Sequence, residues 1–265
     1  MTTSQATRRW DAVRNIYDDR PEGTSIGISI RDLHTGEQFD INGEEDFASA
    51  STIKILIQVG LARAFDEGRL HPDDKRKAPR EIRLEGSGVM NWLDPDLELT
   101  LRDHAWLMIA ISDNSTSNVC IDAVGIEAIN AAGAEIGVGA TRLGRMFMGS
   151  NAPAGPSKNR ATANGLVAIL TAIEEDRAAS PEQCAWMRKC LSDQQHVSRL
   201  PRHLPDTVSY RGKTGTINLI AHDCGVLSGP KGDLAIAVLT HGFEDEYEAD
   251  AFIGRIGTAA AQSIA

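Results

Sequence analysis

Three short motifs follow one another along the chain and bring together residue types that can carry out acyl transfer. They are Ser51-Thr52-Ile53-Lys54, Ser112-Asp113-Asn114 and Lys213-Thr214-Gly215. Residues three apart on a helix lie on one face about one turn apart, so Lys54 can approach the Ser51 hydroxyl. A serine hydroxyl is a poor nucleophile until a base takes its proton, and a lysine can be that base only if burial and neighbours lower its pKa. The motifs thus supply a nucleophile, a proton carrier and an anion anchor.

The sequence around Ser51 indicates that this serine opens a buried helix. A lone serine three residues before a lysine is usually a surface pair. Here an apolar stretch follows the serine: Ile53, Ile55, Leu56, Ile57, Val59, Leu61 and Ala62. A helix that begins there would also direct backbone N–H groups and the positive end of its dipole at a reacting carbonyl, which favours a developing oxyanion.

The second motif lies in a polar cluster between two helical patterns. It follows the apolar run 106–111 and precedes the polar residues 115–118. Asp, Asn and Ser are all good N-caps, so Asp113 can simply begin the next helix. A role in catalysis and a role as a cap stay equally open for Asp113.

The third motif lies between two strand-like segments, 207–210 and 222–227. A strand edge that ends in glycine lets a substrate backbone lie alongside as an added strand. The Lys213 ammonium and the hydroxyls of Thr214 and Thr216 would then face an anionic group.

With these motifs in this order, the chain resembles the class A β-lactamases and penicillin-binding proteins from about residue 22 to its end. The resemblance implies that Ser51 attacks, that Lys54 deprotonates it and that Ser112 relays a proton to the leaving nitrogen. It also implies that the N–H groups of Ser51 and Thr216 form an oxyanion hole. The substrate-binding residues that it implies, with His222 as a weaker candidate, are Asn114, Asn151, Lys213, Thr214, Gly215 and His222.

One residue of the family pattern is missing. In class A enzymes a glutamate in a loop after the second motif activates the water for deacylation. In the matching stretch 141–151, Arg145 and Asn151 fit the pattern, but Phe147 occupies the glutamate position, and no carboxylate occurs between Gly137 and Asn164. Either Lys54 or another group is then the base in both half-reactions, or the acyl-enzyme formed with β-lactams is long-lived.

His222 falls about where many family members carry an arginine that holds the substrate carboxylate. A core histidine hydrogen-bonded to Asp223 is the slightly favoured interpretation, because Cys224 and Val226 look buried. A metal site made of His222, Asp223 and Cys224 is disfavoured, since adjacent strand residues point to alternating faces. We expect no metal and no cofactor.

The function predicted from these residues is a serine hydrolase that acts on amide or lactam bonds through an acyl-enzyme at Ser51, with slow or atypical deacylation. One alternative is a penicillin-binding or sensor protein that acylates without turnover. Another is an esterase or peptidase with no antibiotic substrate. All three expect a small-molecule substrate: a β-lactam, a peptide or an ester.

Composition fits a compact enzyme. The chain has 265 residues, 42% of them hydrophobic, and a net charge of −10. The negative charge argues against nucleic-acid binding, and no basic run is present for an anionic membrane surface. The first ten residues lack the apolar region of a signal peptide, which predicts a cytoplasmic protein; a removed leader would instead predict a periplasmic or secreted one. The four cysteines lack the spacing of a disulfide scaffold.

The predicted fold class is α/β (α+β), with an antiparallel sheet from both chain ends, terminal helices that flank it, and an all-helical lobe. A hairpin is expected over residues 24–41, and three further strands near 207–213, 219–229 and 232–241. We expect one domain over 1–265, with a sheet lobe of about 1–50 and 205–265 and a helical lobe of about 55–200. The resemblance places the active site in the cleft between these lobes.

Overall fold

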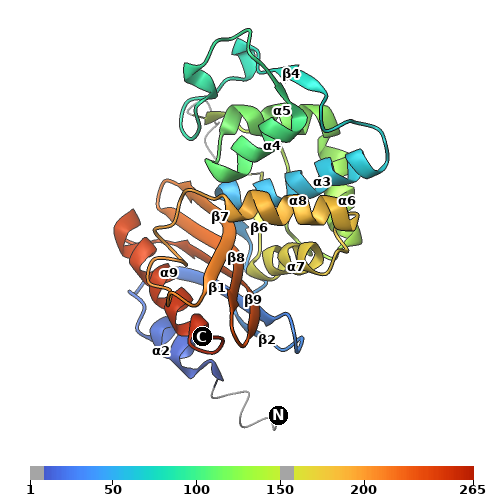
Figure 1. The fold of residues 1–265 in the computed structure, drawn as a ribbon. Coiled ribbons are helices and arrows are strands. Elements are labelled where there is room, and N and C mark those ends of the chain that lie inside the picture. Colours follow the sequence, from blue (N-terminus) through green and yellow to red (C-terminus); the bar gives the residue numbers. More distant parts are fainter. Residues whose placement is uncertain (1–8, 150–157) are drawn as a thin grey trace.

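The computed structural model describes residues 9–149 and 158–265. Its centre is a five-stranded antiparallel sheet with the strand order β2-β1-β9-β8-β7 (Figure 1). The strands are β1 (Ser25–Asp32), β2 (Gln38–Ile41), β7 (Ser209–Ile217), β8 (Ile220–Gly229) and β9 (Gly232–His241). The two ends of the chain therefore build one sheet, and the predicted fold class is confirmed.

Helices cover both faces of the sheet and form the other part of the molecule (Figure 1). The α-helices are α2 (Asp11–Asp18), α3 (Lys54–Asp66), α4 (Leu101–Ala110), α5 (Asn114–Val124), α6 (Ile126–Glu135), α7 (Ala163–Glu174), α8 (Pro181–Ser192) and α9 (Glu246–Ala261). Short 3₁₀ turns are η1 (Ala50–Ile53), η2 (Arg80–Ile82) and η3 (Met90–Trp92), and two small strand pairs join β3 (Phe47–Ala48) to β6 (Arg160–Ala161) and β4 (Lys75–Lys77) to β5 (Glu98–Thr100).

The sheet separates two buried clusters of side chains. Successive residues of β9 point to opposite faces. Ile236 and Val238 pack with residues of α2 and α9, whereas Ala235 and Ala237 pack with the larger cluster formed by the other helices. The sheet is thus buried on both sides, which fixes the register of its strands.

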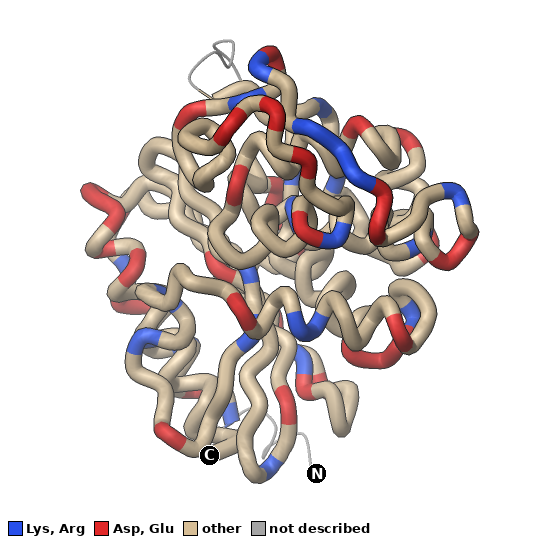
Figure 2. The backbone as a smooth tube through the Cα atoms, turned by 45° about the horizontal axis from the view of Figure 1, so that its top comes forward, with Lys and Arg blue, Asp and Glu red and all other residues tan. Residues whose placement is uncertain are grey.

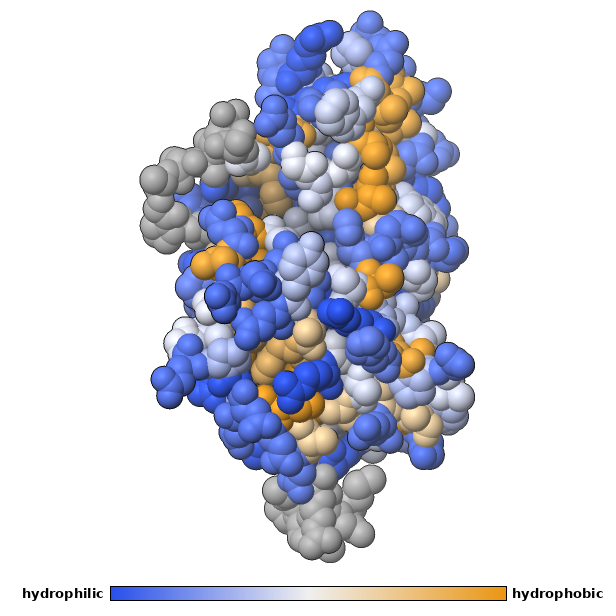
Figure 3. Space-filling view, turned by 90° about the vertical axis from the view of Figure 1, so that its left-hand side faces the viewer, coloured by the Kyte–Doolittle hydropathy of each residue, from blue (hydrophilic) through white to orange (hydrophobic). Residues whose placement is uncertain are grey.

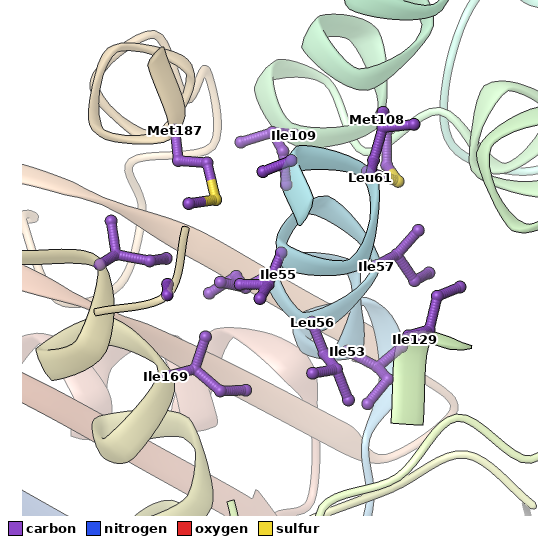
Figure 4. Close-up of a cluster of buried hydrophobic side chains, with 14 of the residues drawn as sticks. Ile53, Ile55, Leu56, Ile57, Leu61, Met108, Ile109, Ile129, Ile169 and Met187 are labelled. Atoms are coloured by element: carbon purple, nitrogen blue, oxygen red, sulfur yellow. The ribbon is translucent and has the colours of Figure 1, made fainter. Parts of the chain in front are cut away.

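Helix α3 runs through the middle of the larger cluster. Only Arg63 and Asp66 of its thirteen residues are not buried. Figure 4 shows Ile55, Leu56 and Ile57 pointing away from this helix in different directions into the surrounding helices. A helix that is apolar on all sides belongs in a core, so Lys54 at its first position is carried into the interior.

The sequence pattern had placed the third motif between two strands, but the motif lies within one strand. Strand β7 pairs with β8 from Ser209↔Ser228 through Ile217↔Ile220, so Gly215 is an interior position. A glycine inside a strand often marks the close approach of another backbone. A Cβ at Gly215 would lie 3.0 Å from the Ser51 nitrogen, which identifies that backbone as η1.

The described residues contain no helix that is long and apolar enough to cross a membrane. Cys120, Cys184, Cys190 and Cys224 are all buried and unpaired with one another. Within the same part of the chain, no three His, Cys, Asp or Glu side chains converge in a way that could hold a metal ion.

The close packing of α3 against α6 makes Gly60 hard to replace. A Cβ at Gly60 would lie 2.8 Å from Ile129 Cγ1 and 3.1 Å from Ile129 Cα. Overpacking of this kind costs about 1–3 kcal/mol, whereas alanine gains only about 1 kcal/mol over glycine in a helix interior. We expect Gly60→Ala to lower the free energy of unfolding in urea denaturation.

The matched control is Gly133→Ala on α6. Its added carbon would meet only the ends of the Leu56 and Val138 side chains, each at 3.0 Å, and these can move aside. The loss of stability should therefore be smaller than for Gly60→Ala. A Gly60→Ala protein as stable as the parent would show that the two helices are not held at this spacing.

Candidate active site

Ser51 lies in the 3₁₀ turn η1 at the entrance to α3. The chain reaches it through Ala50, whose φ of 46° is in the left-handed region. A non-glycine residue in this region costs of the order of 1–3 kcal/mol and is common next to functional groups. The sequence had indicated a helix that begins at the serine, but the α-helix begins at Lys54. Ser51 stays partly exposed while the residues after it are buried.

The Lys54 amine is completely buried and contacts the second motif. Its Nζ lies 2.6 Å from the Ser112 carbonyl oxygen, 3.1 Å from Ser112 Oγ and 2.8 Å from Asn114 Oδ1. Among the described residues, Lys54 Nζ makes no hydrogen bond to the Ser51 hydroxyl. A neutral amine fits this setting, because it can donate to the two carbonyl-type oxygens and accept a hydrogen bond from the Ser112 hydroxyl.

Burial lowers the pKa of Lys54 well below its ordinary value, and the positive charge of Lys213 lowers it further, while Asp113 opposes the shift. The Phe147 ring also packs against this lysine, with the ring centroid 4.6 Å from Lys54 Nζ. The Asn118 side chain holds the Phe147 backbone by two hydrogen bonds, of 2.9 and 3.0 Å. The residue expected at the position of the deacylating base therefore sits directly over the lysine as an apolar ring.

Asp113 is an N-cap, as one of the two interpretations of the motif predicted. Its Oδ1 accepts a hydrogen bond from Thr116 N at 2.9 Å and begins α5. Its Oδ2 accepts from the N–H groups of Val89 and Met90 at 2.6 and 2.9 Å. Asp113 therefore fastens the 85–92 segment beside the site. Ser112, the residue before it, has a φ of 59°, a second left-handed position at this site.

Lys213 is fully buried in β7, and its Nζ donates to the Thr214 carbonyl oxygen at 2.8 Å. Burial lowers the pKa of Lys213 to about 7, with opposing contributions from Cys224 and Asp223. Next to it, Thr214, Gly215 and Thr216 continue the strand past η1. Strand β7 thus brings the hydroxyls of Thr214 and Thr216 to the space beside Ser51, which Lys213 itself does not line.

His222 is completely buried, and the backbone occupies both of its ring nitrogens. Nδ1 accepts from Thr240 N at 3.0 Å, and Nε2 lies 2.9 Å from the Ala48 carbonyl oxygen. Burial lowers the pKa of His222 to about 4. This is a core histidine, although its expected partner Asp223 instead accepts from Tyr210 Oη at 2.6 Å. Its geometry leaves no ring nitrogen for a substrate carboxylate.

Two cavities meet at Ser51. The larger cavity has a volume of about 390 Å³ and lies between η1, the 85–87 loop, Asn114, the 145–149 segment and the end of β7. Glu85, which lies outside the three motifs, also lines this cavity. The smaller cavity, of about 100 Å³, lies between Ser51, Ser112 and the third motif. Asn151, another predicted substrate-binding residue, lies outside the described residues.

Arg199 is a residue of the site that sequence reasoning missed. It lies in the segment between α8 and β7, where no motif or periodicity distinguishes it from other arginines. The side chain is 3% exposed and lines the smaller cavity. Its guanidinium donates to Thr216 Oγ1 at 2.6 Å and to Glu246 Oε1 at 2.9 Å. Only the fold brings these three residues together.

Strand β7 forms one edge of the sheet, and residues at its end line both cavities. On the face of the molecule in Figure 3 the surface is mainly hydrophilic, with hydrophobic residues in separate patches. Ile217 and Leu219, at the turn between β7 and β8, are 42% and 54% exposed.

Comparison with known proteins agrees with this geometry. A crystal structure of a beta-lactamase from Sphaerobacter thermophilus DSM 20745 superposes with a TM-score of 0.90 at 34% identity, over 96% of this chain and 97% of that one. Beta-lactamase CARB-4 of Pseudomonas aeruginosa is 28% identical over 150 residues, which are 56% of this chain and 52% of that protein. The chain thus spans about half the length of this curated relative.

A relative with a different description matches over a longer stretch. The Beta-lactamase regulatory protein BlaB of Streptomyces cacaoi is 22% identical over 275 residues, or 86% of this chain and 88% of that protein. The family model of the Beta-lactamase enzyme family matches residues 8–264, nearly the whole chain. The three motifs, the sheet built from both chain ends and the buried lysine beside Ser51 all lie within this match, and the chain belongs to the Beta-lactamase enzyme family.

Proposed function

We propose that the protein is a serine acyl hydrolase that forms an ester at Ser51 with amide, lactam or ester substrates. The observation that carries this proposal is the buried Lys54 amine, 3.1 Å from the Ser112 hydroxyl and one helical turn from Ser51. A lysine held neutral by burial can accept the serine proton, which an exposed ammonium cannot do. The membership of the chain in the Beta-lactamase enzyme family supports the same chemistry.

The first half-reaction uses the groups around Ser51 in turn. Lys54 takes the hydroxyl proton while Ser51 Oγ attacks the carbonyl carbon, and the N–H groups of Ser51 and Thr216 receive the developing oxyanion. The Lys54 ammonium then returns a proton through Ser112, which delivers it to the leaving nitrogen or oxygen. Asn114 and the β7 edge orient the substrate, and the C–N or C–O bond breaks to leave the Ser51 ester.

The second half-reaction needs a water activated by a base, and Phe147 cannot supply one. Its ring also packs over Lys54 Nζ, with the ring centroid 4.6 Å away. Deacylation then depends on Lys54 itself or on Glu85, which also lines the larger cavity. We infer that hydrolysis of the ester, and not its formation, is the slow step.

A specific observation favours a second candidate function. A site that acylates readily and deacylates slowly suits a penicillin-binding or sensor protein as well as a hydrolase, and Phe147 is the residue on which both depend. The similarity to a beta-lactamase regulatory protein is consistent with this candidate. An esterase or peptidase without an antibiotic substrate would use the same residues and differ in the acyl group alone.

Intact mass spectrometry with benzylpenicillin tests both candidates. We expect the acyl-enzyme to be the dominant species at steady state, because Phe147 replaces the dedicated deacylation base and general-base catalysis typically supplies about 10²–10⁴-fold. The adduct should map to the Ser51 peptide and be absent from Ser51→Ala. Turnover followed on the same samples separates a slow hydrolase from a protein that acylates once.

Three variants assign the deacylation base. Phe147→Leu keeps an apolar side chain and should leave the lifetime of the adduct long, whereas Phe147→Glu should shorten it if the glutamate finds room. Glu85→Gln should lengthen the lifetime only if Glu85 activates the water. Free enzyme that predominates at saturating penicillin with fast turnover would contradict the proposed slow step, and an adduct on another residue would remove Ser51 from the proposal.

The pKa of Lys213, about 7, gives the site a pH-dependent anchor. The lysine is cationic below that pH and loses its charge as the pH rises through it, so attraction for an anionic substrate should fade in the same direction. We expect the preference for benzylpenicillin over its methyl ester, measured as acylation rate per ligand concentration, to fall about fivefold or more across the titration.

The control for this pH effect is Lys213→Gln, which removes the titrating group and keeps a polar side chain. The preference should then be low and nearly independent of pH. A preference that stays constant in the parent protein, or that keeps its pH dependence in Lys213→Gln, would show that Lys213 is not the anchor.

A further inference from the structure

Every hydrogen-bond donor of Arg199 is already used within the protein. A guanidinium has five N–H groups and no acceptor. Nε donates to Asp250 Oδ1, Nη1 donates to the carbonyl oxygens of Gly215 and His222 at 2.9 and 2.8 Å, and Nη2 donates to Thr216 and Glu246. A ligand can therefore gain a bond from Arg199 only by displacing one of these partners.

Two carboxylates balance the charge of Arg199, and they differ in mobility. The Asp250 side chain is 10% exposed and also accepts from Ser198 Oγ at 2.6 Å, so it is fixed. The Glu246 side chain is 53% exposed and stands at the first position of α9. Glu246 also lines the smaller cavity, beside Ser51, Thr214 and Thr216. A negative charge thus faces the place where a substrate group next to the reacting carbonyl would lie.

The fold does not need this carboxylate. The N-cap of α9 is Asp245, whose Oδ1 accepts from Glu248 N at 2.8 Å. Acidic residues follow one another where α9 begins (Figure 2). Negative charge near the positive end of the helix dipole therefore remains without Glu246. Arg199 would keep four of its five bonds if Glu246 were neutral or absent.

We propose that Glu246 is a specificity-determining residue that disfavours substrates with a carboxylate in the smaller cavity and favours acyl donors whose group there is uncharged or cationic. A substrate carboxylate would face Glu246 within the same small space and would compete with it for Arg199 Nη2 and Thr216 Oγ1. Like charges at such distances repel, whereas an ester, an amide or an ammonium group pays no such penalty. This inference rests on the proposed acyl transfer at Ser51.

The test compares benzylpenicillin with its methyl ester in the parent protein, Glu246→Gln and Glu246→Ala. The glutamine keeps an acceptor for Arg199 and removes the charge, and the alanine also frees Nη2 for a ligand. We expect the acid-to-ester ratio of acylation rate per ligand concentration to rise about fivefold in Glu246→Gln and further in Glu246→Ala. Both increases should be smaller at high salt, because salt screens the repulsion between the two carboxylates. The matched control, Glu244→Gln, removes an exposed carboxylate two residues away and should leave the ratio unchanged.

Non-covalent binding of the same two ligands, measured by calorimetry in a Ser51→Ala background, repeats the comparison without acylation. Failure of acylation in the parent protein, together with an acid-to-ester binding ratio that rises on Glu246→Gln, would refute the proposed function and leave this inference standing. A ratio that is unchanged or falls in both variants, which is the result expected if Glu246 only positions Arg199, overturns the inference. Absence of binding of either ligand overturns it as well.

Discussion

The structure of the site depends on burying the Lys54 amine in the protein interior, out of contact with solvent. Lys54 is the first residue of a helix that is buried on nearly every side, and its Nζ is surrounded by Ser112, Asn114 and the Phe147 ring. Burying an ammonium group is costly, and burial lowers the pKa of Lys54 well below its ordinary value. The core that stabilises the protein therefore also shifts the acid–base equilibrium of Lys54 toward the neutral amine.

The neighbouring elements are arranged around this constraint. Left-handed backbone occurs at Ala50, next to the proposed nucleophile Ser51, and at Ser112, the proposed proton relay. Gly215 allows β7 to approach within contact of the Ser51 backbone, where any side chain would collide. Lys213 is a second buried lysine, and its positive charge further lowers the pKa of Lys54. A chain with exposed lysines at the same positions would keep the motifs and lose these pKa shifts.

The sequence predicted much of the fold because its signals are local. The apolar run after Ser51, the alternation in the strands and the polar cluster at Asp113 each reflect the surroundings of a few consecutive residues. Arg199 and Glu246 could not be found in this way, because their roles arise only when segments far apart in the sequence meet. The glycine of the third motif was misjudged as the end of a strand, since close approach to η1 is a tertiary contact. The division into two lobes and the roles of the site residues stay predictions.

The central claim is that burial keeps Lys54 neutral, and its titration tests this most directly. Nitrogen-15 or carbon-13 NMR of the protein labelled at lysine, with the Lys54 signal assigned by Lys54→Met, gives the protonation state of this one amine as a function of pH. The account predicts a pKa well below the ordinary value of 10.5 and a deprotonated amine in the pH range where Ser51 is acylated. A Lys54 amine that remains protonated up to its ordinary pKa would contradict the account.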